Sequence, residues 1–306
     1  MGNSNNRLRF TPAEQAILTT LLYSDIFSFP LTKDELWRFL IVKEKITPKA
    51  FKEGLQSLAK VIVYKDGYYC LQGKEASIIE RKQNLSEVAK KLRQAYLVAT
   101  KLTSIPSIGF IGISGGLANG SATKNDDIDF VVIVKKNTLF TSRLLILGML
   151  ERLGVRRSRG QKEAPDSICV NLLLDERSLT WQKKKQDLYT AREIAQIFPL
   201  FERDGLYERF FIANRWIYTF LPNSTQPKPR IVQAEKNFLI KLFYVLLSNA
   251  VCEYLFRIIQ MSFMKRHQTR EVITKHILAF HPNDYRTFVL RKLRLKMRQF
   301  GLLTKL

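Results

Sequence analysis

Cysteine is scarce in this sequence: its 306 residues contain three, Cys70, Cys169 and Cys252, and they lie far apart. Their spacing excludes a disulfide framework and the paired-cysteine pattern of a structural zinc site. The three histidines likewise show no metal-site spacing. Unpaired cysteines are usually small buried side chains, and disulfides are rare in reducing compartments. We therefore expect reduced thiols in a cytoplasmic protein.

Acidic residues are also scarce, since 27 Asp and Glu face 50 Lys and Arg, which gives a net charge of +23. The excess is uneven: residues 1–80 carry eleven basic and nine acidic side chains, whereas residues 226–306 carry sixteen and four. A field of this sign attracts polyanions such as RNA, DNA or an anionic membrane surface. The alternative is a basic surface without a polyanionic partner, because charge alone does not identify one.

The sequence has no uncharged apolar run long enough to span a bilayer, and its N-terminus lacks the apolar core of a signal peptide. The most apolar segment, Ala234–Met264, is predicted to be one helix, but it contains Lys241, Glu253 and Arg257. Charges inside a span are costly, so we expect a helix packed on a core and no transmembrane segment. Peripheral contact with an anionic membrane is predicted instead for 291–300, RKLRLKMRQF, which alternates basic and apolar residues.

Two carboxylates stand where a buried strand begins. Asp127 and Asp129 are two residues apart, and the run Ile128–Val134, IDFVVIV, is typical of a strand that is buried on both faces. Residues two apart in a strand point to the same face. Like charges held together in this way require a cation or a raised pKa. A turn or cap formed by Asp126 and Asp127 is the alternative interpretation.

A glycine turn precedes the carboxylates at a fixed distance. The apolar run Ile108–Ser114 ends at Gly115 and Gly116, and a helix is predicted from Leu117. Glycine lets the backbone approach a ligand closely, and free amides at such a turn favour phosphate. Amides for phosphate and carboxylates for a divalent cation together predict a nucleotide site.

This pattern resembles the signature of the polymerase-β-type nucleotidyltransferases: a glycine pair, a spacer, then Asp-x-Asp in a strand. The resemblance implies that Gly115 and Gly116 hold a nucleoside triphosphate. It implies that Asp127 and Asp129 bind Mg²⁺, with two ions allowed, for transfer of a nucleoside monophosphate to a hydroxyl acceptor. Segments near residues 199–223 and 265–286 are similar to those of uncharacterised bacterial nucleotidyltransferase-domain proteins that begin with a winged helix.

The family usually adds a third carboxylate from a later strand. The next predicted strand, Ile168–Leu174, offers Asn171 as its only central polar residue, and an amide cannot act as a base. Asp166 and Asp175 flank this strand and are the remaining candidates. With Asn171 in that position, the alternative function is a catalytically weak or inactive nucleotide-binding regulator with a nucleic-acid or protein partner.

The chain as a whole is expected to be an α+β multidomain protein. Threonine-capped helices followed by a hairpin at Asp66-Gly67 predict a winged helix over 8–75, whose near-neutral charge favours packing over DNA binding. One connecting helix is predicted over 76–103 and a mixed-sheet nucleotidyltransferase core over 104–178. A basic helical region is predicted over 179–306. The loop 155–165 is basic, so it either grips phosphates or is simply solvated.

Overall fold

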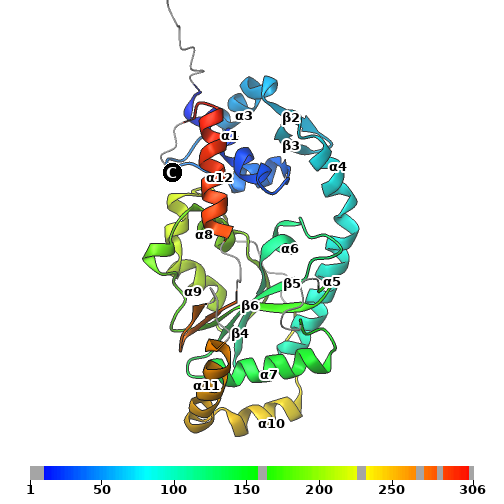
Figure 1. Cartoon of the computed structure of the whole chain (residues 1–306), viewed down its shortest axis with the longest axis vertical. Helices are drawn as coiled ribbons and strands as arrows, with labels where there is room; N and C mark the ends of the chain where they lie inside the picture. The colour runs from blue at the N-terminus through cyan, green and yellow to red at the C-terminus, as the bar shows by residue number, and fades with distance from the viewer. Residues whose placement is uncertain (1–9, 158–163, 226–231, 267–271, 281–284, 303–306) are drawn as a thin grey trace, which may run out of the picture.

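The structure is a computed structural model that describes residues 10–157, 164–225, 232–266, 272–280 and 285–302. These residues form helices and two β-sheets, one of three strands and one of six (Figure 1). The predicted α+β class is therefore confirmed at this level. Of the basic loop, only its two ends lie within the described residues, and of the proline-containing segment 221–230 only residues 221–225 do.

The N-terminal unit, residues 10–71, contains three helices and a three-stranded antiparallel sheet in the order β1-β3-β2. Its elements are α1 (Pro12–Asp25), β1 (Leu31–Thr32), α2 (Lys33–Arg38), α3 (Pro48–Ser57), β2 (Ile62–Lys65) and β3 (Tyr68–Leu71). Thr11, Thr32 and Thr47 cap the three helices, because each side chain accepts a hydrogen bond from a first-turn amide. The sequence predicted all three caps.

The predicted hairpin at Asp66-Gly67 joins β2 to β3. Both turn residues have positive φ, +52° for Asp66 and +87° for Gly67. A two-residue turn of this kind matches the twist of antiparallel strands, and Asp-Gly is a preferred pair for it.

The link to the second sheet is two helices where the sequence predicted one. α4 (Ala76–Gln83) and α5 (Leu85–Leu102) meet at Asn84, which ends the first helix and begins the second. Asparagine has a low helix propensity because its side chain competes for backbone hydrogen bonds. Together the two helices run along one side of the molecule from the N-terminal unit to the six-stranded sheet (Figure 1).

The six-stranded mixed sheet has the order β7-β4-β5-β6-β9-β8, in which only the pair β5-β6 is parallel. Its strands are β4 (Ile108–Ile113), β5 (Ile128–Val134), β6 (Ile168–Asp175), β7 (Phe198–Glu202), β8 (Val272–Ile273) and β9 (Ile277–Ala279). The short helix α6 (Gly115–Asn119) follows β4, so it begins two residues before the predicted Leu117. α7 (Leu139–Arg152) connects β5 to the loop before β6.

The prediction that the chain after Asp175 is helical was wrong, since three of the six strands come from that part. β7 contains Pro199, which argues against a central strand, and it lies at an edge of the sheet, where proline is tolerated. β8 and β9 have two and three residues, too few for a recognisable alternation. The sheet thus continues past the expected core boundary at residue 178.

Two helical layers cover the sheet. One face, with Phe130 and Val132 of β5, packs against α5 and α7. The opposite face, with Val131 and Ile133, packs in the same apolar cluster as α8 (Leu188–Ala195), α9 (Leu206–Ala213) and the N-terminal unit. A short 3-10 helix, Arg215–Thr219, follows α9. The two faces of β5 are therefore covered by different helices.

The predicted helix Ala234–Met264 is a pair, α10 (Phe238–Leu247) and α11 (Ala250–Lys265), bent by 87°. Asn249 causes the break, because its side chain caps α11 by accepting from the Cys252 amide. Among the described residues, no single helix is long and apolar enough to cross a membrane, and the bent pair meets that test only as a combination. The predicted absence of one spanning helix is confirmed for this part of the chain.

The last helix, α12 (Tyr285–Gln299), packs on the N-terminal unit and lies beside α1 (Figure 1). Val289, Leu293 and Met297 are its buried residues, and Lys296 forms an ion pair with Asp25 of α1. The apolar face that was predicted to contact a membrane is therefore covered by protein.

Candidate functional site

Asp129 lies on the face of the sheet that looks toward α8. Successive residues of a strand alternate between faces, and Val131 and Ile133 belong to the cluster that includes α8. Asp129 is two residues before Val131 in the same strand, so its side chain points to the same face of the sheet. Asp127 lies one residue before β5 begins, instead of inside the strand as expected. The carboxylates of Asp127 and Asp129 nevertheless lie close to each other.

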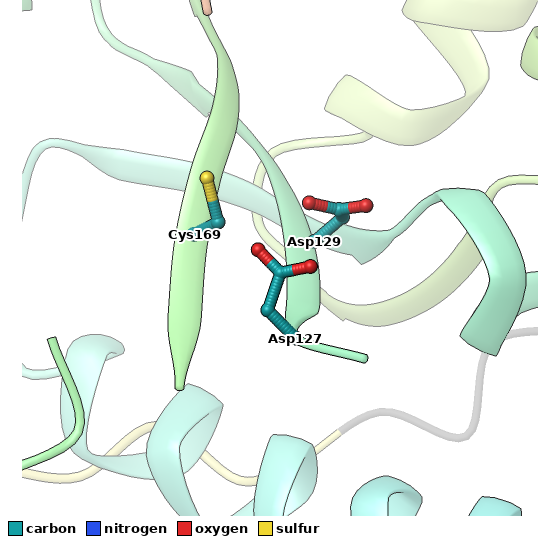
Figure 2. A group of neighbouring side chains, drawn as sticks. All are labelled: Asp127, Asp129 and Cys169. Atoms are coloured by element: carbon teal, nitrogen blue, oxygen red, sulfur yellow. The ribbon is translucent and has the colours of Figure 1, made fainter. Parts of the chain in front are cut away.

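Three side chains form a compact cluster at the start of β5 and β6. Asp127, Asp129 and Cys169 each offer one potential ligand atom, and these atoms lie within 4.8 Å of one another (Figure 2). Cys169 stands opposite Asp129 in the parallel pairing of the two strands. The sequence predicted the two acids as a pair but treated Cys169 only as a buried thiol, because its neighbours on β5 are distant in sequence.

Asn171 contacts the cluster from β6. Phe130 of β5 pairs with Val170 of β6, but the next residue, Val131, pairs with Leu172, so the register shifts by one residue here. Asn171 is the extra residue of this bulge, a feature that commonly redirects a side chain beside a functional site. Its Nδ2 donates to Asp129 Oδ1, and Cys169 Sγ donates to its Oδ1 at 3.4 Å. An amide therefore occupies the neighbouring strand position where the third acid was sought.

Arg157 neutralises one of the two acids. Its Nη1 donates to Asp127 Oδ2 at 2.5 Å, and about one third of the arginine side chain is exposed. The backbone amide of Arg157 donates to the carbonyl of Ile168, which ties this end of the basic loop to the start of β6. Arg156, Arg157, Arg159 and Lys162 are the basic residues predicted to approach phosphates, and Arg159 and Lys162 lie outside the described residues. Of the other two, Arg157 is placed at the acid pair, while Arg156 pairs with Glu151.

Burial and, after it, the charge of Asp127 together raise the pKa of the Asp129 carboxyl to about 8, against the opposing charge of Arg157. Burial also raises the pKa of the Cys169 thiol to about 12, with the two carboxylates acting in the same direction. At neutral pH and without a cation, Asp129 and Cys169 are therefore protonated. Two carboxylates held this close require either a bound cation or a raised pKa. The cluster has the raised pKa, that of Asp129, and a counter-charge on Asp127, the guanidinium of Arg157.

Gly115 comes directly against Asp129. It adopts the left-handed conformation with φ +65°, and a Cβ built at this position would lie 2.7 Å from Asp129 Oδ2. Both facts call for glycine. The Ser114 amide also donates to the Asp129 carbonyl at 2.9 Å, which fixes β4 beside β5 at this level. Gly116 follows within α6 at an ordinary φ, with Ser121 near it: the Ser121 amide donates to its carbonyl at 2.8 Å.

A buried lysine supports the loop that carries the acids. Lys91 of α5 is fully buried, and its Nζ donates to the Asp126 carbonyl at 2.6 Å and to Asp166 Oδ1 at 2.7 Å. Asp126 itself accepts from the amide and the hydroxyl of Thr123. The turn-forming role considered for Asp126 is thus correct, whereas the side chain of Asp127 belongs to the cluster with Asp129 and Cys169.

The two candidates for a third acid, Asp166 and Asp175, have other roles. Asp166 pairs with Lys90 and Lys91 and is not among the cluster residues of the described chain. Asp175 pairs with Arg177 and stands opposite Val134, at the far end of β5. Five residues of strand separate it from Asp129, roughly 16 Å at the usual rise. The expectation that either residue could complete the site was wrong.

Glu193 of α8 is a further carboxyl near the cluster. Its charge is one of those that raise the pKa of Asp129, and burial raises its own pKa to about 7 against the charge of Arg192. The sequence gave no local signal for it, because a glutamate within a helical pattern is ordinarily solvated.

A small cavity of about 70 Å³ lies between α2, α6 and α8, with Glu35, Arg38, Asn119, Arg192 and Gln196 in its lining. Arg192 is only 5% exposed, and its guanidinium lies 3.8 Å above the ring of Phe39. Within the part of the chain that the structure describes, its Nε and Nη1 have no hydrogen-bond partner. A buried positive charge therefore lines a cavity beside Ala118 and Asn119, the last two residues of α6.

Comparisons of this chain with protein-family models, with curated proteins and with solved structures found no match. The proposed function is therefore based on the residues of the site.

Proposed function

We propose that the protein is a Mg²⁺-dependent nucleotidyltransferase that transfers a nucleoside monophosphate from a triphosphate to a hydroxyl acceptor. One observation carries the proposal: the left-handed Gly115 lies directly against Asp129, which clusters with Asp127, although more than ten residues separate the glycine from either acid in sequence. Phosphate-binding amides and cation-binding carboxylates belong side by side in such an enzyme.

The donor set fits Mg²⁺. This ion prefers oxygen ligands and is usually held by one or two carboxylates together with substrate phosphates and water. Asp127 and Asp129 would hold it, whereas the neutral thiol of Cys169 is a soft donor that Mg²⁺ does not favour. The bound cation would supply charge that offsets the triphosphate and the developing oxyanion, and a pair of ions is typically about 3.5–4 Å apart.

The chain's own residues would perform the remaining tasks. Gly115 and Gly116 bring backbone close to the triphosphate without an intervening Cβ, and a nearby hydroxyl comes from Ser121. Arg157, which lies at the acid pair, would pair with a phosphate oxygen once a cation replaces it on Asp127. Asp129 would give up its proton when the cation binds, since an adjacent positive charge favours the carboxylate form.

The N-terminal unit is proposed to be a winged-helix domain used for packing instead of DNA recognition. The order helix, short strand, two helices and hairpin supports the assignment. Its contacts with α12, the ion pair Lys296–Asp25 and the hydrogen bond from Arg38 to the Ala195 carbonyl support a packing role. The net charge of +23 supports RNA or another polyanion as the acceptor, in a cytoplasmic setting.

A second candidate function is a nucleotide-binding regulator with weak or no turnover. The observation that favours it is Asn171, which contacts Asp129 from the strand where an acid was expected. An amide cannot accept the acceptor's proton. Such a protein would bind nucleotide with Mg²⁺ and leave any partner unmodified.

Transfer of label separates the two functions. The purified chain is incubated with each α-labelled nucleoside triphosphate, Mg²⁺ and total cellular RNA or protein. The proposed enzyme labels an acceptor, and the Asp127→Asn variant does not, whereas exposed Asp204→Asn, on the loop after β7, labels it as the wild type does. Mg²⁺-dependent nucleotide binding without any transfer would favour the regulator. Neither binding nor transfer would contradict both.

A further inference from the structure

The bent helix pair α10–α11, residues 238–265, has an apolar surface that the protein leaves uncovered. No residue of α10 is buried, although its sequence FLIKLFYVLL has a single charge. Its large apolar side chains and those of α11 are between 45% and 77% exposed: Phe238, Leu239, Leu242, Phe243, Val245, Leu246, Val251, Leu255, Ile258, Ile259 and Phe263. A helix that is apolar on most sides is normally buried in a core or in lipid.

Two polar side chains of α11, Glu253 and Gln260, point inward, although a water-facing helix normally turns such residues to the solvent. Glu253 accepts from the amides of Phe140 and Thr141 at the start of α7, at 3.0 and 2.9 Å. Gln260 donates to the Phe140 carbonyl at 2.8 Å and accepts from Arg143 at 2.9 Å. α11 is thus attached to the protein through these polar contacts and through Phe256, Met261 and Met264, while its other large apolar residues face outward.

A basic cavity of about 780 Å³ borders this surface. α10 and α11 contribute Tyr244, Tyr254 and Arg257 to its lining. The rest of its positive lining comes from the strand ends and loops beside them: Lys135, Lys136, Arg177 and Lys275. The acidic residues in the same lining are already bound: Asp175 by Arg177, Glu176 by Arg209, and Glu253 by the α7 amides. For Lys136, Arg257 and Lys275, the described residues contain no ion-pair partner.

We infer that the α10–α11 pair and the basic cavity form a docking surface for an anionic phospholipid bilayer. The apolar side chains would enter the interface, and the cavity would receive the phosphate of a headgroup. Tyr244 and Tyr254 stand between the two, where aromatic residues are enriched at membrane interfaces. From residue 236 to 266 the sequence has five basic residues and one acid, Glu253, which is turned inward. The charge therefore complements an anionic surface.

The pair lies in the interface and does not cross the membrane. At the usual helical rise, α10 is about 15 Å long and α11 about 24 Å, below the roughly 30 Å of the hydrocarbon core. The bend of 87° turns one helix away from the axis of the other.

A second copy of the chain fits this surface less well than lipid does. In a two-fold dimer the same patch meets itself, so the basic cavities and flanking lysines of two copies would be brought together. A chain with a net charge of +23 resists that approach.

The docking surface is remote from the candidate active site. α10 and α11 lie beyond α7, at the opposite end of the molecule from the N-terminal unit (Figure 1). Asp129 is on the other face of the sheet, toward α8. Membrane docking would leave the site accessible, and the inference does not depend on the proposed activity.

Sedimentation of the full chain with vesicles tests the inference. Wild-type protein is expected to co-sediment with phosphatidylglycerol vesicles at least tenfold more tightly than with phosphatidylcholine vesicles. The triple variant Phe243→Ser, Leu246→Ser, Ile259→Ser should lose at least tenfold in partitioning, because three large apolar side chains no longer enter the interface. The matched control is Ile79→Ser, Leu97→Ser, Ile212→Ser, which alters equally exposed residues on α4, α5 and α9 and should bind as the wild type does.

A charge variant tests the cavity separately. Lys136→Gln, Arg257→Gln and Lys275→Gln combined should abolish the preference for phosphatidylglycerol. Circular dichroism establishes that each variant is folded. Wild-type protein that stays in the supernatant with anionic vesicles would overturn the inference. So would a triple apolar variant that binds vesicles unchanged, or an apolar surface that mediates only concentration-dependent self-association.

Discussion

Gly115 and Asp129 are in van der Waals contact across β4 and β5, so closely that a Cβ on residue 115 would come within 2.7 Å of Asp129 Oδ2. The glycine of the turn and the second acid of the Asp-x-Asp pattern are thereby one structural unit. This contact between Gly115 and Asp129 accounts for the spacing between the glycine turn and the acid in the sequence.

Gly115→Ala is expected to cost about 1–3 kcal/mol of unfolding free energy, from strained backbone and from displacement of Asp129. Gly205→Ala is the matched control, because Gly205 has the same φ of +65° but nothing within 4 Å of an added Cβ. Chemical denaturation measures both variants. Only Gly115→Ala should also weaken Mg²⁺-dependent nucleotide binding. Equal effects of the two substitutions on binding would show that the contact has no functional role.

The stability of the metal-free protein should fall as the pH rises from about 5 to 8. The pKa of Asp129 is about 8 in the folded protein, against 3.8 for an ordinary aspartate. Between these values the folded state binds more protons than the unfolded state, so unfolding free energy decreases with pH, by at most about 1.4 kcal/mol per unit for one group. Burial raises the pKa of Glu193 as well, so it contributes in the same direction.

Urea denaturation at several pH values measures this slope. Asp129→Asn should remove part of it, and Mg²⁺ should flatten it by stabilising the ionised carboxylates. A slope that is identical in the wild type and in Asp129→Asn would rule out the raised pKa of this residue.

Asn171→Asp places a third carboxylate beside Asp129. Without Mg²⁺ the added negative charge should destabilise the protein through like-charge repulsion, and with Mg²⁺ the loss should be recovered. Thermal unfolding should therefore show a larger Mg²⁺-induced rise in Tm than in the wild type. Gln83→Glu adds the same charge at an exposed position of α4 and should leave that rise unchanged. A smaller rise in Asn171→Asp would mean that residue 171 does not face the cation.

Lys90 and Lys91 bind the same carboxylate, that of Asp166, from a solvent-exposed and a fully buried position. Lys91→Met should cost about 2 kcal/mol or more, because it removes a fully buried donor from the Asp126 carbonyl and from one Asp166 oxygen. Lys90→Met should change stability little, since exposed ion pairs contribute little. Nucleotide binding should weaken only in Lys91→Met, which loosens the loop before Asp127. Equal stability of the two variants would argue against this support.

Local features of the structure could be predicted from the sequence. Threonine caps, the Asp66-Gly67 turn and the strand that carries Asp129 each depend on residues close in the chain. Those signals also brought the glycine turn and the acid pair together as a hypothesis, and the geometry agrees with it.

Features that depend on distant residues could not be predicted in this way. β7 forms because it pairs with β4, and Arg157 reaches Asp127 because its backbone runs beside β6. α11 is more apolar in sequence than the basic α12, yet large apolar residues of α11 are exposed while Val289, Leu293 and Met297 of α12 are buried where it packs on α1. Only the tertiary arrangement distinguishes a face covered by protein from a face left free.

Calorimetric titration of nucleoside triphosphate into the protein, with and without Mg²⁺, tests the central claim most directly. Wild-type protein should bind the nucleotide in the presence of Mg²⁺ and at least tenfold more weakly in its absence. Asp127→Asn should bind weakly under both conditions, and Asp204→Asn should behave as the wild type does. Binding that is independent of Mg²⁺, or that survives unchanged in Asp127→Asn, would contradict a cation-dependent nucleotide site at Asp127 and Asp129.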